Sequence, residues 1–212
     1  MLTQLRRSVV IAVVFFVGLG IVFPLVGTGV AQLFFRGQAD GSLTAQGSTL
    51  IGQNWSDTKC PGHRTGTCVF HGRPDDTGPY AAHPKQDVSG GDDPLVANGS
   101  SGESAATNLG PRSKALVSNT KELVKYWNRL GVANPTPDLV TTSGSGLDPD
   151  ITPADADVQI PMVAKATGVP VGRLRQLVAQ QARGAYWGFL GSPFVDVLQL
   201  NQALAKLDGA GR

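Results

Sequence analysis

The sequence has few charged residues and few of the side chains that most often carry enzyme chemistry. Lys and Arg number 18 and Asp and Glu number 16 among 212 residues, which leaves a net charge of +2. This balance is too weak for a nucleic-acid-binding domain, which needs a basic surface to neutralise phosphates. The three histidines, His63, His71 and His83, lie in one loop-rich stretch, and no Ser-His-Asp or paired-carboxylate pattern accompanies them. We therefore predict no catalytic, cofactor-binding or metal-binding residue.

Charge is absent altogether from residues 9–35, and this absence indicates a membrane anchor. Twelve of the fifteen residues 9–23 are Val, Ile, Leu or Phe. About 20 apolar residues suffice to cross a hydrocarbon core of about 30 Å. A buried helix of a soluble core is a poor alternative, because the segment is apolar on every face. We expect Pro24, Gly27 and Gly29 to bend or end the helix near the far interface.

The basic residues around this segment predict its orientation. Arg6 and Arg7 directly precede it, whereas Arg36 is the first base after it. An excess of basic residues normally stays in the cytoplasm. We therefore predict a cytoplasmic N-terminus and transmembrane anchor over residues 1–35, in the plasma membrane. Residues 36–212 then form an extracytoplasmic domain.

A cleaved signal peptide is the alternative to a retained anchor. Gly29-Val30-Ala31 offers a small-x-small cleavage site before Gln32. Against cleavage, the apolar run is long for a signal peptide, and residues 33–35 continue it past that site. Cleavage would leave an exported binding module with a metal or disulfide loop, whereas a retained anchor would leave a single-pass membrane protein.

The only two cysteines, Cys60 and Cys68, would close a short loop. A disulfide is the default interpretation for such a pair in an oxidising compartment. The same loop also reads as Cys60-x-x-His63 and Cys68-x-x-His71, which is a metal-like local spacing. Zinc sites more often pair Cys with Cys and His with His, and unpaired thiols are a third possibility. The sequence leaves these alternatives open.

The pattern beyond the anchor predicts one α/β (mixed α+β) domain. We expect strands at 48–55, 138–142 and 194–198, helices at 120–130, 153–167, 171–182 and 201–207, and a loop-rich insertion near 56–111. Asn119, with Glu122 three residues on, resembles a capping box for the first helix. Thr152 followed by Pro153 is a strong start for the second, and Asp155 suits its positive end.

Three motifs in this domain admit functional interpretations that we weigh against simpler ones. The two helices across residues 158–182 outline a helix-turn-helix, which would suit an anchored transcription regulator, although an αα-hairpin is simpler. Asp148 and Asp150 would suit a cation, but turn and capping roles explain them more simply. Residues 143–146, a Ser-Gly-Ser-Gly run, lack the lysine of a phosphate-binding loop. Arg73 would suit a partner's carboxylate, with a solvated loop arginine as the default.

Several runs of the sequence, taken in order, resemble the C subunit of the bacterial Kdp potassium-transporting ATPase, the KdpC family. They are Leu50-Ile51-Gly52-Gln53, Phe70-x-Gly72-Arg73-Pro74, Thr107-Asn108-Leu109-Gly110-Pro111, the run DLVTTSGSGLDPDITP over 138–153, Gln159-Ile160-Pro161-x-Val163-Ala164, Gly188-Phe189-Leu190-Gly191 and Leu200-Asn201-x-Ala203-Leu204. The resemblance covers essentially the whole chain, and the run over 138–153 is its most specific part. The sequence departs from the family pattern at residues 56–68, which read as an insertion carrying both cysteines, and at residues 101–106.

The resemblance implies a non-catalytic accessory subunit of a high-affinity, ATP-driven potassium uptake complex. Its implied partners are a channel-like potassium-translocating subunit and an ATP-hydrolysing P-type subunit. The family is described as a catalytic chaperone that raises the ATP affinity of the ATPase subunit. Because ATP is cytoplasmic and this domain is expected outside, such an effect would reach the ATP site as a coupling free energy. No ATP-binding residue is therefore assigned. Gly18 and Gly20 would let the anchor pack closely on other membrane helices.

Overall fold

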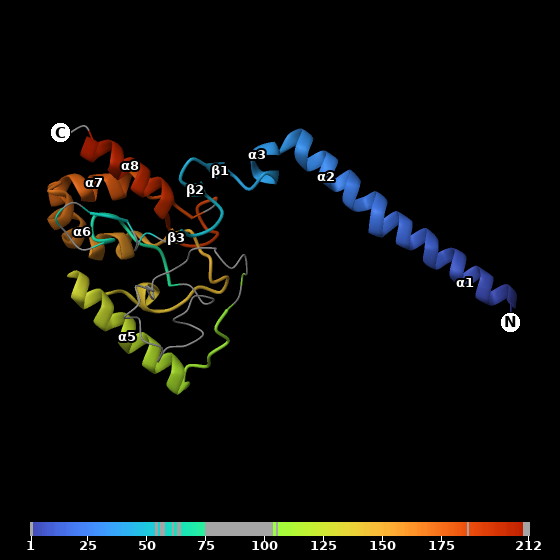
Figure 1. Cartoon of the computed structure of the whole chain (residues 1–212), viewed down its shortest axis with the longest axis horizontal. Coiled ribbons are helices and arrows are strands. Elements are labelled where there is room, and N and C mark those ends of the chain that lie inside the picture. The colour runs from blue at the N-terminus through green and yellow to red at the C-terminus, as the bar shows by residue number, and fades with distance from the viewer. Residues whose placement is uncertain are drawn as a thin grey trace. The chain divides into compact units, whose positions relative to one another are not determined.

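The computed structural model describes residues 2–53, 55, 58–60, 62, 65–74, 104, 106–185 and 187–209 (Figure 1). The chain divides into two units, Met1–Ala45 and Gln46–Arg212. The fold class agrees with the prediction. A single N-terminal apolar helix precedes a domain of mixed helices and short strands.

The first unit is dominated by one helix, Leu2–Phe34, which is long and apolar enough to cross a membrane. It comprises α1 (Leu2–Phe15), a π-helical segment η1 (Phe16–Val22) and α2 (Phe23–Phe34). None of its residues is buried within the protein. The unit continues with α3 (Arg36–Ala39) and β1 (Leu43–Thr44).

The helix passes through Pro24, Gly27 and Gly29 to Phe34, so it does not end at these residues. In the turn before Pro24, the Phe23 N–H donates to the carbonyl of Gly18, five residues back. A proline ring normally clashes with the carbonyl four residues earlier and supplies no N–H. The wider π turn accommodates this defect, and the helix then continues to Phe34.

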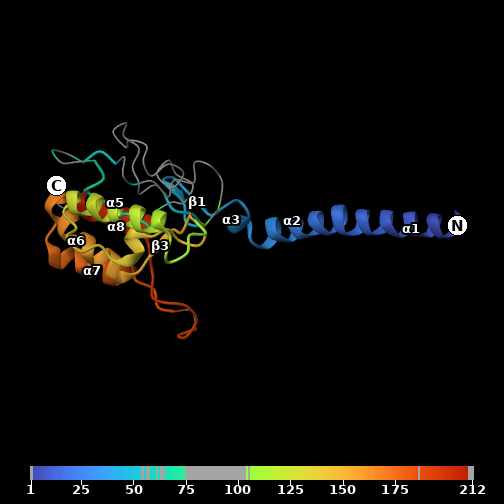
Figure 2. The same cartoon turned by 90° about the horizontal axis from the view of Figure 1, so that it is seen from below.

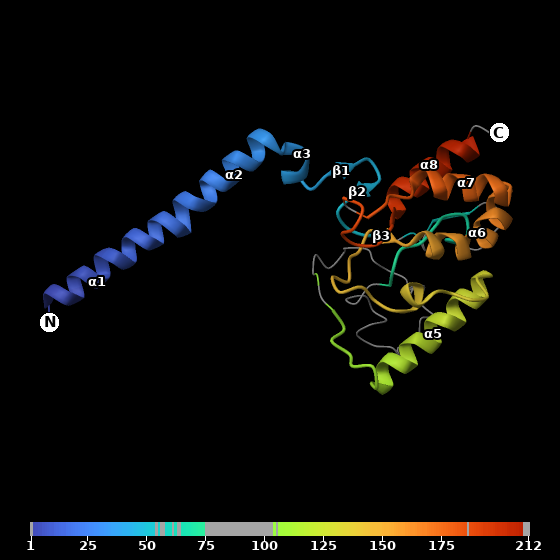
Figure 3. The same cartoon turned by 180° about the vertical axis from the view of Figure 1, so that it is seen from behind.

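The second unit holds the remaining elements. They are β2 (Gly47–Ser48), α5 (Lys114–Leu130), the 3₁₀ turn η3 (Pro137–Val140), β3 (Asp150–Ile151), α6 (Pro153–Thr167), α7 (Val171–Gln181), β4 (Val195–Asp196) and α8 (Val197–Gly209). Strands β3 and β4 pair antiparallel, with Asp150 opposite Asp196 and Ile151 opposite Val195. Figure 3 shows α6, α7 and α8 gathered together, with α5 on the other side of the chain that leads into β3.

One hydrophobic core joins these helices. α5 contributes Leu123 and Trp127, and the other helices and strands β3 and β4 contribute further buried apolar side chains. They include Ile160 and Val163 of α6, Leu174 and Val178 of α7, and Leu200 and Leu204 of α8, together with Phe70, Ile151 and Val195. Phe70 is the member that comes from the loop-rich region. Its burial fixes the extended segment that carries the next motif residues.

The helices agree with the sequence prediction better at their ends than at their starts, because α5 and α8 both begin earlier than predicted. α6 begins at Pro153 after a Thr152 cap, as predicted, and α5 ends before Gly131, whose φ of 99° is left-handed. α5 begins at Lys114, not at 120, because Ser113 accepts a hydrogen bond from the Leu116 N–H and caps it instead of Asn119.

The predicted strands are largely wrong. Residues 138–142 lie partly in the 3₁₀ turn η3, because Pro137 at its first position favours a turn over a strand. Among the described residues of the range 48–55, which leaves out residue 54, only Ser48 belongs to a strand. Residues 194–198 contain the two-residue strand β4, after which α8 begins at once. The Asp196 carboxylate accepts a hydrogen bond from the Gln199 N–H, 2.7 Å away, so α8 is capped earlier than predicted.

Candidate functional site around Arg73

The extended segment at residues 70–74 runs through the unit between two buried side-chain amides. Asn201 of α8 accepts from the Phe70 N–H and donates to the Phe70 carbonyl, both at 2.8 Å. Gln159 of α6 does the same for His71, at 2.8 Å and 3.1 Å. Each side-chain amide therefore makes the two hydrogen bonds that the backbone of a neighbouring strand would otherwise make. A buried backbone group requires such partners, and here they fix the position of Arg73 two residues on.

The His71 side chain is also buried and engaged. Its ring meets the Trp127 ring edge to face, with centroids 5.7 Å apart, and its Nε2 lies 2.7 Å from the carbonyl oxygen of Gly66. Histidine in this position is part of the core. It does not join the cysteines in a metal site.

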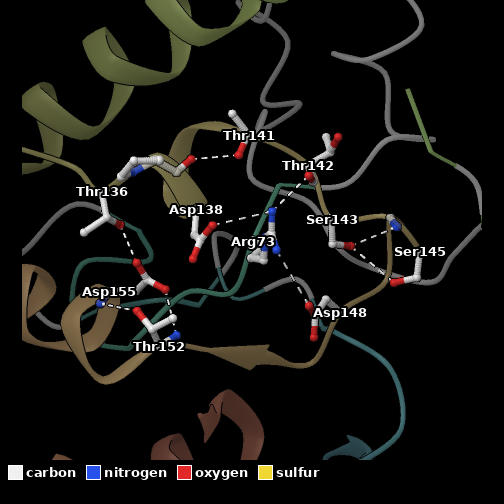
Figure 4. Close-up of polar contacts among 12 residues, drawn as sticks. Arg73, Thr136, Asp138, Thr141, Thr142, Ser143, Ser145, Asp148, Thr152 and Asp155 are labelled. Atoms are coloured by element: carbon white, nitrogen blue, oxygen red, sulfur yellow. Dashed lines mark hydrogen bonds and ion pairs between the residues drawn. The ribbon is translucent and has the colours of Figure 1, made fainter. Parts of the chain in front are cut away.

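Arg73 clamps the segment at residues 138–148 (Figure 4). Its Nη2–H donates to the Thr142 carbonyl at 3.0 Å, and Nη2 lies 3.7 Å from Asp138 Oδ1. Its Nη1 lies 4.0 Å from Asp148 Oδ2. The side chain is only 22 % exposed, so the expectation of a solvated arginine is wrong. A planar guanidinium suits this task because its donors point in several fixed directions.

The Ser-Gly-Ser-Gly run forms a turn held by its own hydroxyls. Ser143 Oγ accepts from the Gly146 N–H at 3.0 Å, and Ser145 Oγ accepts from the Leu147 N–H at 3.2 Å. Gly146 adopts a φ of 70°, which favours glycine. The Gly52 N–H donates to the Leu147 carbonyl at 2.8 Å, so the first motif run meets the most specific one. This geometry fits a structural turn and not a phosphate cradle.

Asp155 joins the start of α6 to the chain before η3. Its Oδ2 accepts from the Thr152 N–H at 2.7 Å, and Thr152 Oγ1 accepts from the Asp155 N–H at 3.2 Å. This capping box confirms the predicted helix start. The Thr136 hydroxyl donates to the other carboxylate oxygen (Figure 4), a contact that the sequence did not predict.

Asp148, one of the two acidic residues weighed as a cation site, has other contacts. Asp148 Oδ1 accepts from the Asp150 N–H at 3.0 Å, which is a turn contact, and its Oδ2 faces Arg73. Within the part of the chain that the structure describes, no group of three or more His, Cys, Asp or Glu side chains could hold a metal ion. Partial burial, together with the nearby charges of Asp148 and Asp196, raises the pKa of Asp150 from 3.8 to about 6, and Arg183 opposes the shift.

We expect Asp150→Asn to stabilise the fold at neutral pH. Between about pH 4 and 6 the folded Asp150 binds more proton than the unfolded one, so stability falls as pH rises through this window. The unscreened shift of about two pKa units would be worth about 3 kcal/mol, and partial exposure reduces this to about 1 kcal/mol. Thermal unfolding in detergent between pH 4 and 7 measures it. The exposed Asp157→Asn of α6 serves as the control, and a variant with an unchanged pH slope would contradict the expectation.

Cys60 and Cys68 form a disulfide, with Cα atoms 5.7 Å apart. The default interpretation is therefore confirmed, and the thiols are not metal ligands. The Cys68 N–H also approaches Cys60 Sγ at 3.0 Å. His63 and most of the predicted insertion near 56–111 lie outside the described residues. So do four of the six residues 101–106, the second departure from the family pattern.

Loss of this disulfide should lower stability moderately. The chain-entropy relation for a loop of about nine residues gives about 2.6 kcal/mol for the Cys60→Ser/Cys68→Ser variant. Denaturant unfolding of the full chain in detergent, with and without reductant, checks the value. Reductant should destabilise the wild type and leave the double variant unchanged. Equal unfolding of oxidised wild type and variant would contradict the expectation.

Helices α6 and α7 pack as an αα-hairpin around Gly168, whose φ is 76°. The apolar side of α7, Leu174, Leu177 and Val178, is buried in the core. Arg173 and Arg175 are exposed, as a recognition helix would require. The pair is nevertheless integral to the fold of this unit, which the hairpin interpretation expects.

Sequence reasoning missed the roles of Gln159 and Asn201, although both occur in the family-like runs. Their signal was a polar amide inside an apolar helical stripe. Such a residue is buried only when it is fully hydrogen-bonded, so it predicts a backbone partner without naming it.

Comparison with known proteins gives one consistent result across both units. The family model described as K+-transporting ATPase, c chain (KdpC) matches residues 5–206. A potassium-transporting ATPase KdpC subunit from Methylorubrum extorquens is 43 % identical over 213 residues, covering 98 % of each chain. Namesakes from Bradyrhizobium diazoefficiens and Rhodopseudomonas palustris are 42 % and 43 % identical, covering 97 % and 96 % of this chain and 98 % and 97 % of theirs.

Proposed function

Since the chain belongs to the KdpC family of K+-transporting ATPase c chains, we propose that it is the non-catalytic accessory subunit of a high-affinity, ATP-driven potassium uptake complex. Membership in the family makes it a membrane-associated subunit of a potassium-transporting ATPase. The finer proposal is that it assists assembly and raises the ATP affinity of the subunit that hydrolyses ATP. The observation that carries the proposal is the family match, which includes the apolar helix and the domain together.

The contacts around Arg73 support a structural role for the most specific motif run. Arg73 of the segment at residues 70–74 binds the Thr142 carbonyl, Ser143 Oγ accepts from the Gly146 N–H, and the Thr152 N–H donates to Asp155. The family-like runs thus stabilise the conformation of this part of the second unit. Potassium transport and ATP hydrolysis are then the tasks of two other subunits, a channel-like protein and a P-type ATPase.

The proposed topology is single-pass, with residues 1–35 as cytoplasmic N-terminus and anchor and residues 36–212 outside the cytoplasm. Arg6 and Arg7 before the helix support this orientation. A reporter fused after Arg212 tests it, because an enzyme that is active only outside the cytoplasm should then be active. A mature N-terminus at Gln32 would instead indicate a cleaved signal peptide and would contradict the anchor.

Purification in mild detergent from potassium-starved cells tests the accessory role. We expect a channel-like protein and a P-type ATPase to accompany this chain in a fixed ratio. A second measurement compares the ATPase with and without this chain. A coupling free energy of about 1–3 kcal/mol would raise the Kd of the ATPase for ATP about 5- to 150-fold when the chain is absent. A lone chain that is stable without partners would contradict the proposal.

A further inference from the structure

A loop of the second unit, outside the Arg73 site, exposes an unusual number of apolar side chains. This tip loop, residues 184–193, lies between α7 and β4 and contains no charged residue. Its base is closed by two backbone hydrogen bonds between Arg183 and Phe194, at 2.8 Å and 3.0 Å. Figure 2 shows the segment between α7 and β4 extending away from the packed helices.

Trp187 and Phe189 of the tip loop are 86 % and 74 % exposed, the highest values among the large apolar side chains described in this unit. Leu190, the next residue of the loop, is 45 % exposed. Trp187 also has a φ of 53°, a left-handed conformation that bulky residues rarely adopt. Neither burial nor a favoured backbone conformation stabilises the tryptophan here. A contiguous exposed cluster of this kind is typical of a contact site.

The chain that leads into the tip loop carries exposed basic residues. Residues 158–195 contain four basic residues and no acidic one, although the whole chain has a net charge of only +2. Arg173 and Arg175 of α7 are exposed. Arg183, also exposed, lies at the base of the tip loop, where its Nη2–H donates to Gln199 Oε1 at 2.6 Å. In Figure 2, α7 lies on the side of the unit toward which the tip loop extends. Apolar and basic groups together complement an anionic lipid surface.

The membrane is within reach of this surface. Eleven residues separate Phe34, the last residue of the anchor helix, from Gln46, the first of the second unit. With α3 helical, this connection spans up to about 30 Å. A unit of this size has a radius of gyration of about 15 Å. The tether therefore lets the tip loop meet the bilayer and gives it a high effective concentration there.

We propose that the tip loop and α7 form a second membrane-contact site of this chain. The apolar side chains of the loop enter the headgroup region of an anionic phospholipid bilayer, and the arginines of α7 face its phosphates. Tryptophan prefers this interfacial region because its ring is apolar and its N–H is polar. The proposal concerns the anchored chain alone and holds whether or not the chain assists a potassium pump.

Tryptophan quenching by brominated lipid tests the proposal. The full chain is reconstituted in vesicles of phosphatidylcholine and phosphatidylglycerol, 3:1, with bromine on the upper acyl chain. Trp127 is buried and Trp55 is partly buried, so the lipid should quench mainly Trp187. Because Trp187 is one of three tryptophans, the wild type should lose about a third of its tryptophan emission. Trp187→Phe should lose most of this quenching. The matched control, Trp187→Phe/Val117→Trp, moves the tryptophan to a 46 % exposed position on α5 and should remain unquenched.

The charge component is tested separately. Arg173→Gln/Arg175→Gln should reduce quenching several-fold in the anionic vesicles and leave it unchanged in pure phosphatidylcholine. Raising the salt should have the same effect on the wild type. Equal quenching of wild type and Trp187→Phe would overturn the proposal. Protection of Trp187 from an aqueous quencher only in the presence of partner subunits would also overturn the proposal, because the loop would then bind protein instead of lipid.

Discussion

Replacing Gln159 by leucine is expected to lower the stability of the second unit by about 3 kcal/mol. The variant removes both hydrogen bonds to the His71 backbone and a third to the Asp155 carbonyl, at 3.2 Å. Leucine nearly fills the same volume, so little of the effect comes from a cavity. The cost arises because the buried N–H and C=O of His71 lose their partner, at about 1–3 kcal/mol for each unsatisfied group.

Chemical unfolding of the full chain in detergent measures this loss, and hydrogen exchange of the His71 amide localises it. Gln180→Leu, on the exposed side of α7, is the matched control and should change stability by less than about 0.5 kcal/mol. Asn201→Leu should destabilise similarly through Phe70. Both amides bind the segment at residues 70–74. The double variant should therefore lose less stability than the sum of the losses of the two single variants. A loss below about 1 kcal/mol for Gln159→Leu would contradict this description of the segment.

The sequence predicted the elements whose signals are local. The anchor is recognisable because exposing so many apolar side chains to water is unfavourable. α6 is recognisable because Thr152, Pro153 and Asp155 define its start within four residues. The αα-hairpin of α6 and α7 follows from apolar periodicity and the glycine between them. These features need no knowledge of what lies across the core.

The site depended on contacts between distant parts of the chain, which is why it was not predicted. Arg73 meets Thr142 across 69 residues, and His71 meets Gln159 across 88. The sequence of residues 138–142 predicts a strand, but Pro137 begins a 3₁₀ turn there. The carbonyls of this segment accept hydrogen bonds from Arg73 and Trp127 instead of from a neighbouring strand. Extended segments such as 70–74 are also easily missed, because side-chain amides satisfy their backbone where a sheet normally would.

Trp127 is expected to be the most sensitive position of the core. Its side chain is fully buried, and its Nε1–H donates to the Leu139 carbonyl at 2.8 Å. The ring also packs edge to face against His71 and Tyr126. Trp127→Ala should cost about 4–5 kcal/mol, because it leaves a cavity and an unpaired carbonyl. Circular dichroism during thermal unfolding measures the loss without relying on tryptophan emission.

Trp127→Phe separates the two causes, because it keeps most of the ring and removes the N–H. We expect it to cost about 1–2 kcal/mol. Trp127 and Arg73 hold the 138–148 segment from two sides, so loosening it should also reduce assembly with the proposed partner subunits. Co-purification at low and normal growth temperature tests this, and cooling should restore assembly of Trp127→Ala if stability is the cause. Loss of assembly by a fully folded Trp127→Phe at both temperatures would contradict that explanation and would point to a direct contact near this residue.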